Sequence, residues 1–141
     1  MFDTNLGIRL LDRVKSIPIV DTLKIRIDDF SEGFCKATVP HQRCYDGIFK
    51  SFHGGLLMTV ADSIACFAIM TRTGPDEPLT TTDMNIRFLA PCLTDVTAVA
   101  RVIKIGRTLC PVAVDLFDAN GAQVAVAQVT YMRLDKPPDR S

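Results

Sequence analysis

The 141-residue sequence predicts an α+β fold in which one antiparallel sheet of five to six strands wraps around one long helix, with a short helix at the N-terminus. Two observations lead to this prediction. Residues 54–72 are apolar on almost every side, which is typical of a helix buried in a core. Most of the flanking segments alternate apolar and polar residues, and the last four follow one another without an intervening helix.

The N-terminal helix is expected to end before Pro18. Its apolar residues recur at helical spacing after three possible cap residues; they are Leu6, Leu10, Leu11 and Val14, behind Asp3, Thr4 and Asn5. From Asp21 the period changes to two, which predicts a strand through Ile27. After a turn, residues 34–39 are expected to complete a hairpin.

Three or four further strands are expected, within residues 80–89, 96–105, 108–117 and 122–134. Glycine-containing turn signals separate most of them, the clearest being Gly106-Arg107 and Asn120-Gly121. Pro111, inside one of these segments, implies an edge, a bulge or a misplaced boundary. Residues 1–134 are expected to form a single domain, and residues 135–141 a disordered tail.

Charge and composition argue against several classes of protein. Sixteen Lys and Arg balance sixteen Asp and Glu, so the basic character of a nucleic-acid-binding protein is missing, and a neutral, apolar globule favours self-association. The longest apolar run, residues 64–70, is much shorter than a membrane span, and no signal-peptide pattern opens the chain, so we expect a cytoplasmic protein. The five cysteines are odd in number and form no CxxC pair, which argues against disulfides and zinc.

The segment His53-Gly54-Gly55, directly before the buried helix, is a candidate site for an oxyanion. Glycines allow close approach to the backbone, and the free N–H groups of a first helical turn carry partial positive charge. Such a helix end can stabilise a carbonyl oxygen that becomes negatively charged. The alternative is that the glycines only make a sharp turn and that His53 caps the helix.

Asp62 is the second candidate, because an ionised carboxylate in an apolar helix is costly unless it is paired or functional. It could act as a general base or nucleophile. The alternative is a thin polar seam facing water, made of Thr59, Asp62, Ser63 and Cys66. Gly54 and Asp62 are separated by about 12 Å along one helix. If both act in one site, Asp62 must come from a neighbouring subunit, which predicts a dimer with composite sites.

Several motifs together carry a resemblance to a known family. They are His53-Gly54-Gly55 with an Asp nine residues after the histidine, residues 81–86, Leu89-Ala90-Pro91 and residues 104–108. Over about residues 20–134 the chain resembles the hotdog-fold acyl-CoA thioesterases of the phenylacetic-acid-pathway type. The resemblance implies a sheet wrapped around the central helix, dimers that join their sheets, pairing of dimers into tetramers, and hydrolysis of acyl-CoA without a cofactor.

The resemblance also implies roles for individual residues. Asp62 would attack the thioester or activate the water that does so, opposite the Gly54 amide of another subunit, and His53 would orient that amide. Thr81 would help to position water, although it could equally be an ordinary strand threonine. Gly55 and Ser63, next to these residues, are further candidates for substrate binding.

The chain departs from the family pattern before the glycines. Many members have an Asn six residues before the histidine, where this chain has Gly47, with Asp46 one step further away. Either Asp46 serves in place of the Asn or the contact is absent. Lys104, Arg107 and Thr108 flank a turn where the resemblance implies contacts to the nucleotide end of CoA, although turns are usually solvated.

Other functions and sites stay open. The chain could be a hotdog hydratase or dehydratase, or an acyl-CoA-binding module without activity. Four apolar residues could line an acyl pocket or belong to the core: Phe52, Leu56, Met58 and Phe88. A metal held by His41, Cys44 and Cys35, or a Cys–His nucleophilic pair, is disfavoured because the spacing is irregular and nothing orients the histidine.

Overall fold

The computed structural model describes residues 3–135. In chain order its elements are α1 (Thr4–Lys15), α2 (Pro18–Leu23), β1 (Arg26–Ser31), β2 (Phe34–Val39), the 3-10 turn η1 (Arg43–Tyr45), α3 (Gly54–Thr73), β3 (Leu79–Phe88), β4 (Val96–Val102), β5 (Leu109–Asp118) and β6 (Gln123–Arg133). The tail predicted for residues 135–141 lies, from residue 136 onward, outside the described residues.

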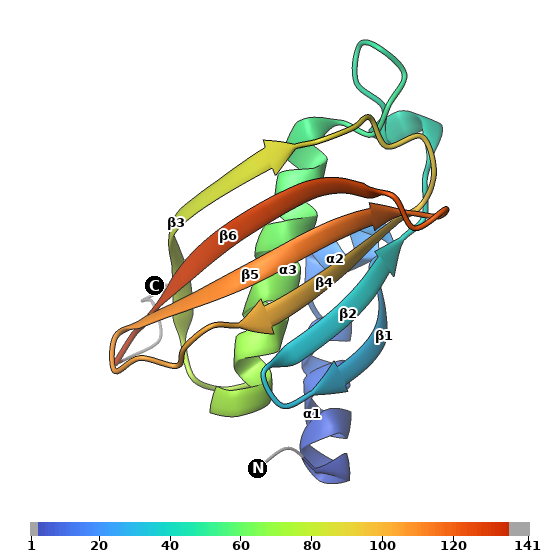
Figure 1. Cartoon of the computed structure of the whole chain (residues 1–141). Helices are drawn as coiled ribbons and strands as arrows, with labels where there is room; N and C mark the ends of the chain where they lie inside the picture. Colours follow the sequence, from blue (N-terminus) through green and yellow to red (C-terminus); the bar gives the residue numbers. More distant parts are fainter. Residues whose placement is uncertain (1–2, 136–141) are drawn as a thin grey trace, which may run out of the picture.

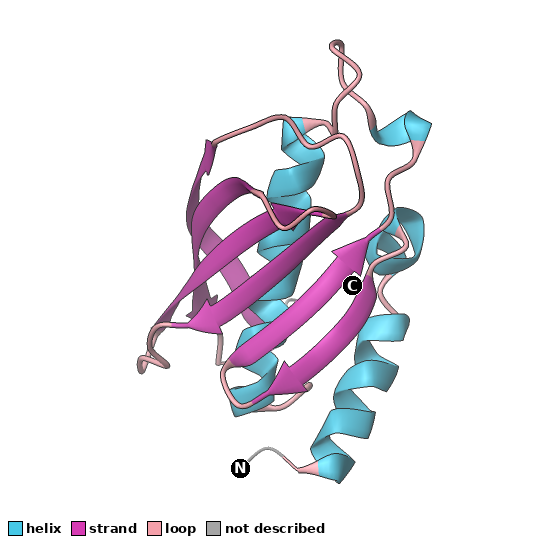
Figure 2. Cartoon of the chain, turned by 45° about the vertical axis from the view of Figure 1, so that its right-hand side comes forward, coloured by secondary structure: helices cyan, strands magenta, loops and turns pink. Residues whose placement is uncertain are grey.

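The strands form one six-stranded antiparallel sheet in the order β1-β2-β4-β5-β6-β3. The sheet curves around α3, which crosses its concave side (Figure 1). Figure 2 shows the same arrangement from another side, with α1 beside the edge that β1 forms. The predicted α+β hotdog architecture, including the long central helix and the short N-terminal helix, is confirmed.

The core lies between α3 and the sheet because α3 has almost no polar side. Its fully buried residues are Val60, Ala61, Ile64, Ala65, Ala68 and Ile69. They meet the inward side chains of β2, β4 and β5, where buried and less buried residues alternate along each strand. By length and composition α3 could also cross a membrane, but 56% of its apolar stretch is buried inside the fold, as in a core helix.

The N-terminal region confirms one prediction and corrects another. Asp3 caps α1 by accepting a hydrogen bond from the Leu6 N–H (2.8 Å). The predicted start of the first strand at Asp21 is wrong, because a second helix, α2, covers residues 18–23 and the strand begins at Arg26. Pro18 opens α2 at a position where its missing N–H costs nothing, and Lys24 ends it in the left-handed conformation (φ 56°).

Pro111 lies at the end of a ladder. β5 is an interior strand, so the proline is not on an edge strand. The regular pairing of β4 with β5 ends at Val102 and Val112, one residue before Pro111 is reached. Beyond that point the Pro111 carbonyl oxygen still accepts a hydrogen bond from the Ile103 N–H (2.9 Å). The missing proline N–H is tolerated because the residue opposite it, Ile103, lies beyond the end of β4.

Truncating Ile64 should measure how much the packing of α3 stabilises the fold. Ile64→Ala leaves a cavity at a fully buried position and should lower the free energy of unfolding by about 2–5 kcal/mol. Urea denaturation measures this free energy. Ile103→Ala is the matched control, because Ile103 is 58% exposed, and it should change stability by less than about 0.5 kcal/mol. Equal losses in both variants would contradict the placement of the core.

Candidate active site

His53 caps α3 and leaves one amide of its first turn open. Its ring Nδ1 accepts a hydrogen bond from the Gly55 N–H (2.9 Å), so the neutral ring carries its proton on Nε2. Its carbonyl oxygen accepts from the N–H groups of Leu56 and Leu57 (3.0 and 3.1 Å). Among the described residues nothing accepts from the Gly54 N–H, which lies at the positive end of the helix.

Aromatic rings also pack closely against both glycines. A Cβ on Gly55 would lie 2.9 Å from Cε1 of the His53 ring, and a Cβ on Gly54 would lie 3.2 Å from Cζ of Phe88. The alternative drawn from the sequence, a capped helix after a glycine turn, is therefore present in the structure. It is compatible with an oxyanion site, because capping occupies the Gly55 amide and leaves the Gly54 amide free.

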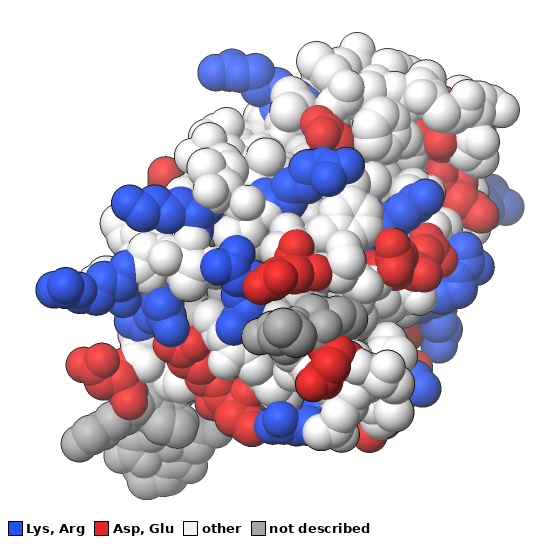
Figure 3. All heavy atoms as spheres, turned by 60° about the horizontal axis from the view of Figure 1, so that its bottom comes forward, with Lys and Arg blue, Asp and Glu red and all other residues white. Residues whose placement is uncertain are grey.

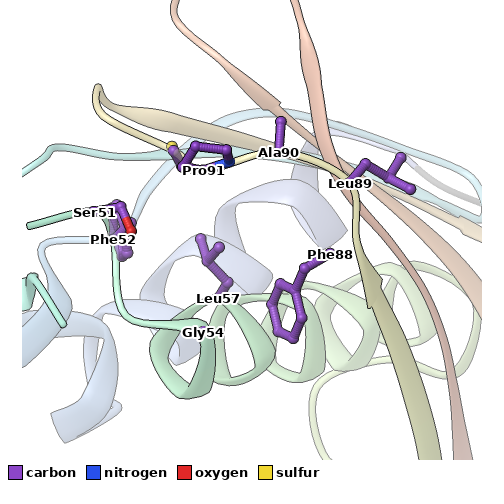
Figure 4. A pocket seen from close by; sticks show the side chains of 9 residues that line it. Ser51, Phe52, Gly54, Leu57, Phe88, Leu89, Ala90 and Pro91 are labelled. Carbon is purple, nitrogen blue, oxygen red and sulfur yellow. The ribbon is translucent and has the colours of Figure 1, made fainter. Parts of the chain in front are cut away.

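A cavity of about 410 Å³ opens beside Gly54 (Figure 4). The Phe88 ring lies over Gly54, and Leu57 points into the same space. The lining is mostly apolar: Ser51, Phe52, Gly54, Leu57 and residues 88–92. Of the four apolar residues considered for an acyl pocket, Phe52 and Phe88 line this cavity, whereas Leu56 and Met58 do not.

The Asp62 carboxylate is held by two hydroxyl groups of the sheet. Thr81 on β3 donates to Oδ1 (2.7 Å), and Tyr131 on β6 donates to the same Oδ1 (2.9 Å) and to the Asp62 backbone oxygen (2.9 Å). Asp62 itself is half-buried, and Thr81 is exposed. The structure thus brings two of the predicted residues, Asp62 and Thr81, into direct contact.

Tyr131 is the residue of this cluster that sequence reasoning missed. It stands directly opposite Thr81 in the β3–β6 pairing, just where the register shifts between Thr81 and Asp83. Its side chain is only 6% exposed, and burial raises its pKa far above the ordinary value, so the hydroxyl stays protonated and can donate. A signal existed in the sequence: an inward-facing tyrosine needs a polar partner for its hydroxyl.

The polar seam considered as an alternative is also real. Thr59, Asp62, Ser63 and Cys66 are all half-buried along one side of α3. The Thr59 hydroxyl donates to the Gly55 carbonyl oxygen (3.0 Å), and the Ser63 hydroxyl donates to the Thr59 carbonyl oxygen (2.8 Å). Ser63, predicted to bind substrate, therefore donates its hydroxyl proton to its own helix, whereas Asp62 accepts hydrogen bonds from the sheet.

The residues before α3 differ from the family pattern in a definite way. The carboxylate of Asp46 pairs with His41 Nε2 (2.7 Å). Gly47 lies against the His53 ring, since a Cβ there would be 3.6 Å from its Cδ2. The Asp46 carboxylate thus contacts His41, and Gly47 has no side chain that could reach the Gly54 amide.

Lys104, Arg107 and Thr108 are exposed in the connection between β4 and β5. That connection lies toward the C-terminal end of α3, away from Gly54 (Figure 1). Figure 3 shows this lower part of the molecule, where Lys and Arg lie on both sides of the face with Asp and Glu among them. Within one chain the structure does not bring these three residues to His53 and Gly54, nor does it bring Gly54 to Asp62.

The imagined metal ligands lie apart. Cys35 is fully buried in β2, Cys44 is exposed, and His41 contacts Asp46. Across residues 3–135, no three His, Cys, Asp or Glu side chains are grouped to hold a metal ion.

Thiol chemistry tests whether a cysteine could serve as a nucleophile. Burial raises the pKa of Cys66 to about 12 and also raises the pKa values of Cys35, Cys92 and Cys110. Since the thiolate is the reactive form, iodoacetamide at pH 8 should modify exposed Cys44 and leave the other four intact in the folded protein, as read by mass spectrometry. Cys44→Ser should remove the fast reaction, and rapid modification of Cys66 would contradict the structure.

Comparison with known proteins places these features in a family. Residues 49–125 match the Thioesterase superfamily. Acyl-coenzyme A thioesterase 13 of Homo sapiens is 35% identical over 83 residues, which are 57% of this chain and 59% of that protein, so less than two thirds of the relative is matched. A thioesterase family protein from Silicibacter pomeroyi is 25% identical with a TM-score of 0.84 (92% of this chain, 98% of that one). The PaaI protein of the E. coli phenylacetic acid degradation operon is 19% identical with a TM-score of 0.87 (97% and 99%) and shows the shared fold. Because the match to the family covers more than half of the residues of this chain, the chain belongs to the thioesterase superfamily.

Proposed function

We propose that this protein hydrolyses an acyl-CoA thioester to the free acid and CoA in a site shared by two subunits. The main support is the state of Asp62: both hydroxyl donors bind Oδ1, and nothing among the described residues binds Oδ2. A carboxylate held in this way and still half-exposed can act as a nucleophile or a base. Family membership and the similarity to human acyl-coenzyme A thioesterase 13 support a thioester as the bond that is attacked.

The reaction needs water as its only co-reactant. Oδ2 of Asp62 attacks the thioester carbonyl carbon, or it takes a proton from the water that attacks. The carbonyl oxygen becomes an oxyanion, which the free Gly54 N–H would stabilise. The C–S bond then breaks and the CoA thiolate leaves with the electron pair. In the nucleophilic version, water afterwards hydrolyses the acyl–Asp62 anhydride and restores the carboxylate.

Two subunits are required because Gly54 and Asp62 lie on one rigid helix, about 12 Å apart along its axis. A second α3 running in the opposite direction would bring the Gly54 amide of one subunit to Asp62 of the other. Two-fold symmetry would make two such sites at once. Exposed apolar residues before α3 support burial against a second copy: Ile48 and Phe49 are 88% and 87% exposed in the projecting loop (Figure 1).

The free edge of β3 supports the same assembly. β3 is the last strand of the sheet and is ten residues long, and most of its side chains are exposed, Thr81 among them. An unpaired edge of this length is a template for pairing with another strand. In the proposed dimer the two β3 edges meet beside the two Asp62 residues, and such dimers would pair further into tetramers.

The substrate would be divided between the two ends of α3. In an antiparallel pair, Lys104, Arg107 and Thr108 of one subunit lie toward the N-terminal end of the other α3, where they could hold the phosphates of CoA. A cavity of about 720 Å³ has Cys66 in its wall, one turn from Asp62; its apolar part, with Phe67, Met70 and Leu79, could take an acyl chain, while Arg13, Asp76 and Glu77 make the rest of its wall charged. The cytoplasmic location expected from the sequence stays a prediction.

Replacing Asp62 should remove the activity. Asp62→Asn keeps the size of the side chain but cannot attack or accept a proton, so kcat/KM should fall by about 10²-fold or more. The measurement is thiol release from aromatic, short-chain and long-chain acyl-CoAs. Asp12→Asn, an exposed acid on α1, is the control. Unchanged hydrolysis in Asp62→Asn would refute the mechanism, whereas tight acyl-CoA binding by a wild type that hydrolyses none of the panel would favour a binding module.

Subunit mixing tests the composite site. Asp62→Asn and His53→Ala damage opposite halves of each site, so subunit exchange between the two inactive proteins should restore activity in heterodimers. With random pairing, about one site in four would carry both intact halves. The recovered fraction is measured by thiol release after native mass spectrometry has verified the heterodimers. Verified heterodimers without activity would overturn the shared site.

A further inference from the structure

The geometry points to Tyr131 as a positioning residue that fixes the Asp62 carboxylate and selects Oδ2 as its reacting oxygen. Its kinetic consequences rest on the proposed function, whereas its effect on the ionisation of Asp62 does not. The motifs and the family resemblance do not include this residue, whose only signal in the sequence is its inward-facing position, and it does not touch the substrate in the proposed reaction.

The Tyr131 hydroxyl donates to two acceptors that belong to the same residue, Asp62. Its proton is shared between the Asp62 backbone oxygen and Asp62 Oδ1, each 2.9 Å from the tyrosine oxygen. Because one acceptor belongs to the helix backbone and the other to the side chain, the hydroxyl ties the carboxylate to its own helix. Asp62 therefore has one favoured side-chain orientation relative to α3.

The second donor makes the two carboxylate oxygens unequal. Thr81 also donates to Oδ1 (2.7 Å), so both hydrogen bonds from the sheet converge on one oxygen. Oδ1 is stabilised as a charged acceptor, and Oδ2 keeps its lone pairs for the carbonyl carbon or for a water proton. This difference between the two oxygens is compatible with both the nucleophilic and the general-base mechanism.

The position of Tyr131 suits a permanent donor. β3 and β6 place Thr81 and Tyr131 opposite each other, so the two hydroxyls approach Asp62 from neighbouring strands. The tyrosine is 6% exposed and meets two titratable groups of α3, Asp62 and Cys66, while Arg13 of α1 acts on Cys66. Burial and both of these neighbours disfavour the phenolate, so Tyr131 remains a donor at any pH at which the reaction would run.

Tyr131→Phe tests the inference. Loss of a hydrogen bond to a charged group should lower kcat about tenfold or more while KM changes little. Because the lost donor favoured the ionised carboxylate, the acid limb of the kcat/KM profile should move to higher pH. The matched control is Tyr45→Phe: Tyr45 is also 6% exposed, and its hydroxyl also donates to a backbone oxygen, that of Thr22 (2.9 Å). The control should share any loss of stability but keep the wild-type kinetics and profile.

A readout independent of turnover separates this inference from the proposed function. The Asp62 carboxyl carbon, followed by NMR, should titrate at higher pH in Tyr131→Phe than in the wild type, and at an unchanged pH in Tyr45→Phe. An Asp62 titration identical in all three proteins would overturn the positioning role, whether or not the wild type hydrolyses acyl-CoA. A wild type without hydrolysis but with the shifted titration would refute only the proposed function.

A second variant covers failure of Tyr131→Phe to fold. Incorporating 3-fluorotyrosine at position 131 keeps the ring shape and makes the hydroxyl a stronger donor. It should move the Asp62 titration to lower pH, opposite in sign to the effect of Tyr131→Phe. A shift to higher pH, or none, would contradict the inference.

Discussion

The packing of α3 into the concave face of the sheet is the interaction on which the rest of the structure depends. Its central residues, such as Ile64 and Ala65, are fully buried, so the helix is held as a rigid rod. That rod fixes the separation between the open Gly54 amide at one end and Asp62 two turns further along. It also places the Asp62 side of the helix against β3 and β6, which carry the two hydroxyl donors, Thr81 and Tyr131.

The same helix carries core residues and candidate site residues at different positions. Glycine has a lower helix propensity than alanine, yet at the start of α3 the two glycines allow the His53 ring and Phe88 to approach the backbone closely. Asp62 interrupts an apolar sequence, but its desolvation is offset by charge-assisted hydrogen bonds from neutral hydroxyls. The half-buried Asp62 carboxylate is therefore accommodated beside the core without an ion pair among the described residues.

Much of the fold could be predicted from the sequence because periodicity is a local property. The long apolar stretch is typical of a buried helix and became α3, and the period-two segments after it became β3 to β6 with ends that differ by a few residues. The first strand was misplaced because Leu23 and Ile25 fit a strand pattern equally well. The helix of residues 18–23 is set instead by Pro18 at its start and by the left-handed Lys24 at its end.

The candidate site was predictable only where a residue contrasted with its surroundings. Asp62 stands out in an apolar helix, and the paired glycines stand out before it, so both can be recognised from the sequence alone. The role of Tyr131 cannot be recognised in this way, because it depends on the strand register that sets Tyr131 opposite Thr81. Tyr131 is also almost seventy residues along the chain from Asp62. The pairing of Asp46 with His41 was equally hidden, because both lie in the irregular segment that follows β2.

The register shift in β3 has a consequence for how tolerant the site is to slippage. It falls within three consecutive threonines, Thr80, Thr81 and Thr82, and the middle one faces Asp62. A one-residue slip of a strand normally exchanges the inward side chain for one of different character. Here a slip in either direction would present another threonine hydroxyl. The strand thus contains built-in redundancy: the chemical identity of the second donor to Asp62 is preserved even if the exact pairing at this end of the sheet is not.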